Sequence, residues 1–124
     1  MKKIISTDKA PKAIGPYSQA IESNNMIFLS GQLPINPQDG SIPQDIKGQT
    51  EMVLKNIQSI LTQAGLTLEN VVKTTVFMTD LTKFSEMNEI YEKYFSSNPP
   101  ARSTIEVKSL PKGVMIEIEC IAVK

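Results

Sequence analysis

The spacing of apolar residues changes period along this chain, and the order of the periods constrains the fold more than any other feature. Strands are expected at residues 2–5, 17–21, 26–30, 71–79, 103–108 and 114–123. Helical spacing is expected at residues 45–64 and again at 84–95. The order β-β-β-α-β-α-β-β predicts an α+β fold, in which one mixed sheet carries both helices on one face.

Residues with strong local preferences mark the ends of the two expected helices. Asp45 is the expected N-cap of the first helix, and Gly65 is the expected residue just after its end. Asp80 or Thr82 is expected to cap the second helix, which the prolines at 99–100 end. Loops rich in proline and glycine are expected at 9–16 and 31–43.

The last expected strand has apolar residues on both of its faces. Ile118 and Cys120 share one face, interpreted as the core side, while Glu117 and Glu119 share the other. Because two helices cover only one side of such a sheet, the opposite side keeps apolar surface that needs burial. We therefore expect a homo-oligomer, and clefts at such interfaces commonly hold small-molecule sites.

Composition narrows the class of protein. The 124 residues predict a single domain, 1–124, with no membrane span and no signal peptide, so a cytoplasmic protein is expected. The formal net charge is zero, which argues against binding to nucleic acid. The chain has no histidine and one cysteine, which excludes Ser-His and Cys-His nucleophile pairs, imidazole metal sites and an internal disulfide.

The chain's thirteen basic residues include one arginine, Arg102, which follows Pro99-Pro100-Ala101. A guanidinium grips a carboxylate with two parallel hydrogen bonds, whereas an ammonium is a point charge. The stiff backbone before Arg102 suggests a receptor for a carboxylate. The alternative is a surface arginine in an ordinary ion pair.

Glu119 lies in the middle of a strongly apolar strand, where a buried carboxylate is costly unless it has a partner or a water. If it is functional, it orients a water molecule or takes a proton from it. Glu117 is a weaker candidate on the same face. The alternative places both glutamates at an oligomer rim, in solvent or paired with lysine.

Four further residues are candidates for a ligand-binding cleft. Ser30 and Gly31 end an apolar strand, and glycine permits close approach of the backbone to a ligand. Tyr17 follows Gly15-Pro16 and can present its hydroxyl group to a cleft, although packing is the commoner role. Asn88 lies on the second expected helix, where solvent exposure is the alternative.

These segments together resemble the RidA (YjgF-like) reactive intermediate deaminases. The matching motifs, in chain order, are GPYSQA at 15–20, SGQLP at 30–34, NEIY at 88–91, PARS at 100–103, LPKG at 110–113 and IEIE at 116–119. The resemblance runs from the first expected strand to the last. It implies a chorismate-mutase-like fold and a homotrimer with three sites in clefts between subunits.

The resemblance also implies an activity, the hydrolysis of 2-imino acids and their enamine tautomers, such as 2-iminobutanoate and 2-iminopropanoate, to 2-oxo acids and ammonia. It implies that Arg102 binds the substrate carboxylate and that Glu119 holds the attacking water. Other cleft positions match Tyr17, Ser30, Gly31, Asn88 and Thr104. No metal and no cofactor is implied.

One position departs from the resemblance, because many relatives have cysteine where this chain has Thr104. Contact with a ligand through the backbone tolerates threonine, whereas a thiol role does not. Two alternative functions remain. The same cleft can serve a non-catalytic module that binds small carboxylates, and some relatives carry the label of ribonuclease or translation inhibitor. Zero net charge and the lack of histidine weigh against the ribonuclease.

Overall fold

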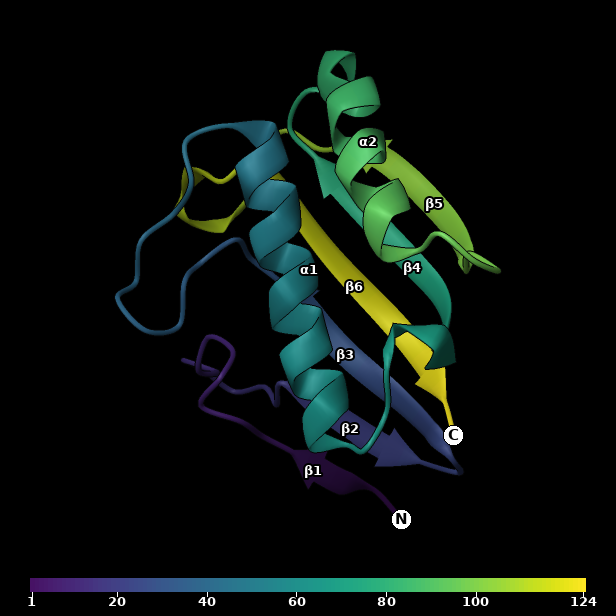
Figure 1. Ribbon diagram of the computed structural model, residues 1–124. Coiled ribbons are helices and arrows are strands. Elements are labelled where there is room, and N and C mark those ends of the chain that lie inside the picture. Colours follow the sequence, from purple (N-terminus) through teal and green to yellow (C-terminus); the bar gives the residue numbers. More distant parts are fainter.

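The computed structural model describes all 124 residues, and its six strands form one mixed sheet in the order β1-β2-β3-β6-β4-β5. The strands are β1 (Lys3–Ile5), β2 (Ala20–Ser23), β3 (Met26–Gln32), β4 (Val71–Met78), β5 (Ala101–Glu106) and β6 (Ile116–Val123). All neighbours are antiparallel except β4 and β5. The helices α1 (Ile46–Gln63) and α2 (Phe84–Tyr94) lie on the same face of the sheet (Figure 1). The predicted α+β fold and element order are confirmed.

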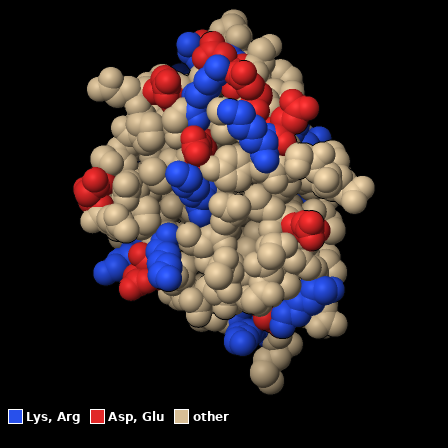
Figure 2. All heavy atoms as spheres, viewed as in Figure 1, with Lys and Arg blue, Asp and Glu red and all other residues tan.

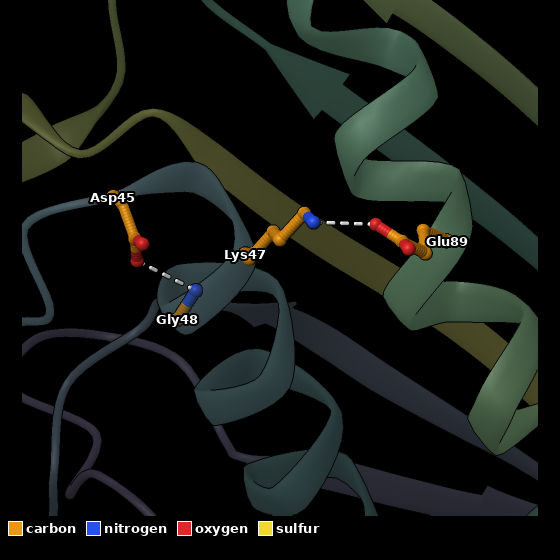
Figure 3. Close-up of polar contacts among 4 residues, drawn as sticks. All are labelled: Asp45, Lys47, Gly48 and Glu89. Carbon is orange, nitrogen blue, oxygen red and sulfur yellow. Dashed lines mark hydrogen bonds and ion pairs between the residues drawn. The ribbon is translucent and has the colours of Figure 1, made fainter.

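The first helix begins and ends at the expected residues. The Asp45 carboxylate accepts a hydrogen bond of 2.9 Å from the Gly48 amide, which satisfies one of the free donors of the first turn (Figure 3). Gly65 follows the helix with a φ of +77°, a conformation that glycine adopts without a Cβ penalty. Between these ends, α1 buries an apolar face that includes Val53, Ile57 and Leu61.

Asp80, rather than Thr82, caps the second helical segment. Its carboxylate accepts hydrogen bonds from both the amide and the hydroxyl group of Thr82. A short 3₁₀ turn (Leu81–Lys83) follows and leads directly into α2, which ends before Phe95. The Asp80 side chain therefore fixes where α2 starts above the strands β4 and β5.

Several strand boundaries differ from the sequence prediction by two or three residues, including the start of β6, which is Ile116 and not residue 114. β2 begins at Ala20, later than predicted, and β3 continues through Gly31 to Gln32, since a bulge in its pairing with β6 accommodates the glycine. β5 begins at Ala101 and ends at Glu106, so Arg102 lies inside a strand and not in the approach to one. As an edge strand beside β4, β5 tolerates the prolines that precede it.

The central strand β6 separates a packed face from an open face. Ile116, Ile118, Cys120 and Ala122 are all buried toward the helices. On the opposite face no helix covers the sheet, and Phe28 and Ile105 there are 42% and 44% exposed. The predicted division of β6 into a core face and an uncovered face is confirmed.

The charged side chains do not form a patch of one sign on the helix-bearing side of the molecule, where lysines lie among acidic residues (Figure 2). This mixture agrees with the zero net charge. No helix in the structure is long and apolar enough to cross a bilayer.

The contribution of the α1 core face is testable by cavity formation. Ile57 is fully buried, so Ile57→Ala removes packed methyl groups and is expected to lower the free energy of unfolding by about 2–5 kcal/mol. Chemical denaturation followed by circular dichroism measures this loss. The exposed neighbour Gln58 supplies the control Gln58→Ala, whose free energy of unfolding is expected to stay close to that of the wild type. Equal effects of both substitutions would contradict the assigned helix face.

Candidate functional site

The Arg102 guanidinium lies under α2 and is held by three of its side chains. Its Nη1 donates a hydrogen bond of 2.8 Å to Oδ1 of Asn88. Its central carbon lies 4.7 Å from the ring centroid of Tyr91 and 5.3 Å from that of Phe84. Stacking on aromatic faces and a single neutral hydrogen bond fix the plane of the guanidinium without neutralising its charge.

Tyr91, one of the rings that supports Arg102, is itself anchored in the core. Its hydroxyl group shares a hydrogen bond of 2.7 Å with Oγ1 of Thr74, and both residues are buried. Burial raises the pKa of Tyr91, so the phenol stays neutral. The strand β4 thereby positions the ring on which the β5 guanidinium rests.

The guanidinium of Arg102 has no carboxylate partner within the protein. The ion pairs of the structure are Lys47–Glu89, Lys55–Glu51 and Lys124–Glu22, and each uses a lysine. The alternative of an ordinary surface ion pair is therefore not what the chain forms. A hollow of about 440 Å³ adjoins the guanidinium and is lined by Asn88, Tyr91, Glu92, Phe95, Ser96, Pro99, Pro100 and Arg102.

α2 is connected to α1 near the residue that binds Arg102. Lys47 of α1 contacts Glu89 of α2 at 2.5 Å, and Glu89 directly follows Asn88 (Figure 3). Their hydrogen bond lowers the pKa of Glu89 and raises that of Lys47. Because both side chains are about half exposed, this pair orients the helices and contributes little to stability.

Glu119 lies on the uncovered face of the sheet. It faces Thr75 of β4 and lines a small hollow of about 220 Å³ with Phe28, Leu29, Lys73, Thr75, Cys120 and Ile121. Across β3, the register places Leu29 opposite Cys120 and Gln32 opposite Ile118. Ser30 and Gly31 thus form a bulge opposite Glu119, and such bulges commonly re-aim groups beside binding sites.

Tyr17 and Ser30 are connected through the loop before β2. The Ser30 hydroxyl donates a hydrogen bond of 2.6 Å to the Ser18 carbonyl, and the Ser30 amide donates to the Gln19 carbonyl at 2.9 Å. The buried Gln19 side chain bonds in turn to the backbone of Thr7 and Pro11. Tyr17, which is 51% exposed, therefore projects from a firmly held segment beside the bulge.

The candidate residues fall into two groups on opposite faces of the sheet. Arg102 and Asn88 meet on the helix-bearing face, whereas Glu119 lies on the uncovered face two strands away from β5. Adjacent strands lie about 4.8 Å apart, so the intervening sheet prevents Arg102 and Glu119 from sharing one ligand within a protomer. Any site that uses both residues must combine two copies of the chain.

Three supporting residues were missed by the sequence prediction of the site. Phe84 and Tyr91 hold the guanidinium, and Thr74 holds Tyr91. A signal was present for the first two, because residues 84, 88 and 91 share one helix face at i, i+4 and i+7. Nothing in the local sequence pairs Thr74 with Tyr91, since that contact depends on how α2 crosses β4.

Two residues with oxygen or sulfur side chains near the site have contrasting surroundings. Oγ1 of Thr104 is buried and has no hydrogen-bond partner. Cys120 is 3% exposed in the core, where burial raises the pKa of its thiol to about 12. The interpretation of Cys120 as a core residue is confirmed.

No cluster of three metal-binding side chains occurs in the structure.

Comparison with known proteins places the chain in a family. The sequence model of the family described as Endoribonuclease L-PSP matches residues 7–124. A RutC family protein of Pyrococcus horikoshii is 53% identical over 125 residues, covering 100% of this chain and 99% of that protein. The chloroplastic Reactive Intermediate Deaminase A of Arabidopsis thaliana is 52% identical over 122 residues, covering 98% of this chain and 65% of that protein.

The fold agrees with this relationship. The crystal structure of Escherichia coli TdcF with bound serine superposes with a TM-score of 0.95 at 46% identity, covering 98% of each chain. The chain belongs to the family of the Endoribonuclease L-PSP model, which is the RidA (YjgF-like) family that its motifs resemble.

The faces assigned to β6 predict the reactivity of its one thiol. Reagents that attack thiolates are expected not to modify Cys120 in the native protein at pH 8, since the thiol is buried and its pKa is raised to about 12. Unfolding in denaturant is expected to release one reactive thiol per chain. Mass spectrometry of the labelled protein measures both states. Rapid labelling of the folded protein would contradict the core position of Cys120.

Proposed function

We propose that this protein hydrolyses 2-imino acids and their enamine tautomers to 2-oxo acids and ammonia, with 2-iminobutanoate and 2-iminopropanoate as expected substrates. The observation that carries the proposal is Arg102, an immobilised guanidinium with no carboxylate partner in the protein. A ligand that supplies the missing carboxylate gains two charge-assisted hydrogen bonds there. The name of the Arabidopsis relative, a reactive intermediate deaminase, supports the reaction class.

The proposed site lies between two subunits of a homotrimer. Arg102 and Asn88 come from one subunit, and Glu119, Ser30 and Gly31 come from the next, because these groups occupy opposite faces of one sheet. The uncovered face, with Phe28 and Ile105 exposed, supplies the apolar surface for subunit contact. Within this single domain, 1–124, Tyr17 is assigned to the cleft by its match to the family motifs, and Thr104 by its position two residues after Arg102.

The chemistry suits a chain without histidine. An imine carbon is already electrophilic, so hydrolysis needs orientation, charge stabilisation and a placed water rather than a covalent nucleophile. In the proposal, Arg102 fixes the acid group of the substrate and Glu119 accepts a hydrogen bond from the attacking water. No step requires a metal ion or an organic cofactor.

A binding module without turnover is the second candidate, because the structure of TdcF holds serine, an amino acid with the carboxylate that Arg102 is proposed to bind. Glu119→Gln separates the two functions. It is expected to lower kcat about 10²-fold or more, as loss of a general base does, while binding of a non-reacting 2-oxo acid changes little. Calorimetry measures the binding. Wild-type protein that binds but does not accelerate hydrolysis would favour the module.

The name of the matching family model raises a ribonuclease as a third function. RNA binding needs a positively charged surface. The net charge of this chain is zero, and its lysines lie among acidic residues on the face shown in Figure 2. Without histidine, the chain also lacks the usual acid–base group of metal-independent RNA cleavage. The deaminase is therefore the proposal that the charge distribution and the site favour.

The fork geometry of Arg102 is tested by Arg102→Lys. This variant keeps the positive charge but loses the bidentate contact, so imine hydrolysis is expected to fall to near the uncatalysed rate in a folded protein. Threonine dehydratase generates 2-iminobutanoate in the assay, and semicarbazide traps the imine that remains. Lys112→Arg, at an exposed position, is the control and is expected to keep full activity. An Arg102→Lys protein with most of its activity would contradict the carboxylate clamp.

The intersubunit site is tested by mixing two inactive variants. After dissociation and reassembly of Arg102→Ala with Glu119→Gln, random assembly is expected to leave about one quarter of the sites with both residues intact. Activity per subunit is therefore expected to recover to about that fraction, whereas each variant alone stays inactive. Light scattering during size-exclusion chromatography checks that the reassembled species is a trimer. A mixture without any recovery would contradict a site shared between subunits.

A further inference from the structure

We propose that Tyr91 and Thr74 are positioning residues, which act on the proposed reaction by holding the Arg102 guanidinium in the plane that receives a substrate carboxylate. This inference rests on the proposed imine hydrolysis and assigns the orientation of its carboxylate clamp to one buried hydrogen bond. The two hydroxyl groups act through Arg102 and touch neither the substrate nor the attacking water.

The guanidinium takes its orientation from one face of α2. Phe84, Asn88 and Tyr91 lie at i, i+4 and i+7, so the two aromatic residues are about 10.5 Å apart along the helix axis. The guanidinium carbon lies 5.3 Å from the Phe84 centroid and 4.7 Å from the Tyr91 centroid, and Asn88 accepts a hydrogen bond of 2.8 Å from Nη1. Because one hydrogen bond permits rotation about itself, contact with the rings sets the plane of the guanidinium.

The sheet joins the same residues a second time. In the parallel register of β4 and β5, Thr74 lies directly opposite Arg102, and neighbouring strands lie about 4.8 Å apart. Tyr91 contacts both strands from α2, because its hydroxyl group shares a hydrogen bond of 2.7 Å with Oγ1 of Thr74 while its ring contacts the guanidinium. Three side chains from three elements therefore form a closed set of contacts, in which a shift of Tyr91 moves the guanidinium.

The bond to Thr74 fixes the outer end of the Tyr91 ring. The helix backbone holds its Cβ atom, and Phe95 packs on the ring with the centroids 4.7 Å apart and the planes tilted by 41°. Contact between two rings permits sliding, whereas a hydrogen bond at the hydroxyl group defines one position for that end. Burial raises the pKa of Tyr91, so the anchored group is a neutral phenol that leaves the guanidinium charge to a ligand.

Packing alone does not require these two hydroxyl groups. Val76 and Met78 follow Thr74 on the same face of β4, and both are apolar and fully buried. Valine has nearly the shape of threonine and needs no partner at position 74, and phenylalanine needs none at position 91. A neutral hydrogen bond in the core adds little net stability, since both groups bond to water in the unfolded chain. The pair instead supplies a defined orientation.

Tyr91→Phe and Thr74→Val each remove one hydroxyl group and nearly keep the shape of the side chain. Each variant is expected to bind 2-oxobutanoate, the product of 2-iminobutanoate hydrolysis, about tenfold more weakly in calorimetry. The value of kcat/KM is expected to fall by a similar factor through KM, because the carboxylate is bound in both the ground state and the transition state. The double variant is expected to match the single variants, since the two groups act as a unit. Thr74→Ser, which keeps a hydroxyl group, is expected to bind as wild type.

A second measurement reports on the guanidinium directly. The chain has one arginine, so the Nε–H group of Arg102 gives the single arginine side-chain signal in ¹⁵N NMR spectra. Aromatic rings displace the signals of nearby protons, so this signal is expected to move and broaden in Tyr91→Phe and in Thr74→Val. Ile57→Ala is the control, because it destabilises the core face of α1 and is expected to change neither the signal nor the affinity.

The outcomes distinguish this inference from the proposed function. Wild-type affinity or an unmoved arginine signal in Thr74→Val would overturn the positioning role and leave the deaminase intact. Losses that multiply in the double variant, or an equal loss in Ile57→Ala, would also overturn it. A wild-type protein that binds 2-oxobutanoate but hydrolyses no 2-imino acid would overturn the deaminase, and the affinities would still decide the role of the pair. If Tyr91→Phe does not fold, Thr74→Val and Thr74→Ser decide the point.

Discussion

The pairing of β6 between β3 and β4 is the constraint on which the rest of this structure depends. The strand joins two sets of strands, β1-β2-β3 and β4-β5, that have no other hydrogen-bonded connection within the sheet. Its apolar residues at 116, 118, 120 and 122 form the floor of the core beneath α1 and α2. The strict alternation of a strand then directs Glu117 and Glu119 to the other side. One strand therefore contributes both to the core of the fold and to the proposed site.

The separation of charged groups by the sheet keeps the proposed site open. If Arg102 and Glu119 lay on one face at short range, they would form an internal ion pair, and a ligand carboxylate would have to displace it. Instead, Arg102 rests on Phe84 and Tyr91 and hydrogen-bonds to a neutral amide. Glu119 lies on the other face of the sheet, beside apolar residues and Lys73. The folded protomer thus keeps Arg102 and Glu119 apart, and neither forms an ion pair within the protein.

The local sequence was sufficient to predict which segments form helices and strands. It was insufficient to predict which side chains of different elements contact one another. Asp45 and Gly65 marked the ends of α1 because capping depends on residues three or four positions apart. The position of Cys120 in the core was also predictable, because side chains alternate between the two faces of a strand. In contrast, the start of β5 at Ala101 depends on pairing with β4, and the contact between Thr74 and Tyr91 depends on helix packing. Such long-range contacts leave no signal in a neighbouring stretch of residues, and the proposed site residues came from the family motifs instead.

The position of β6 also has a consequence for synthesis on the ribosome. The strand that completes the sheet is the last of the six to be made, so β3 and β4 leave the exit tunnel with unpaired edges. Until β6 arrives, these edges and the apolar face of α1 are exposed to other nascent chains. The complete sheet can therefore form only after translation of residues 116–123, and before then strand pairing is limited to the sets β1-β2-β3 and β4-β5.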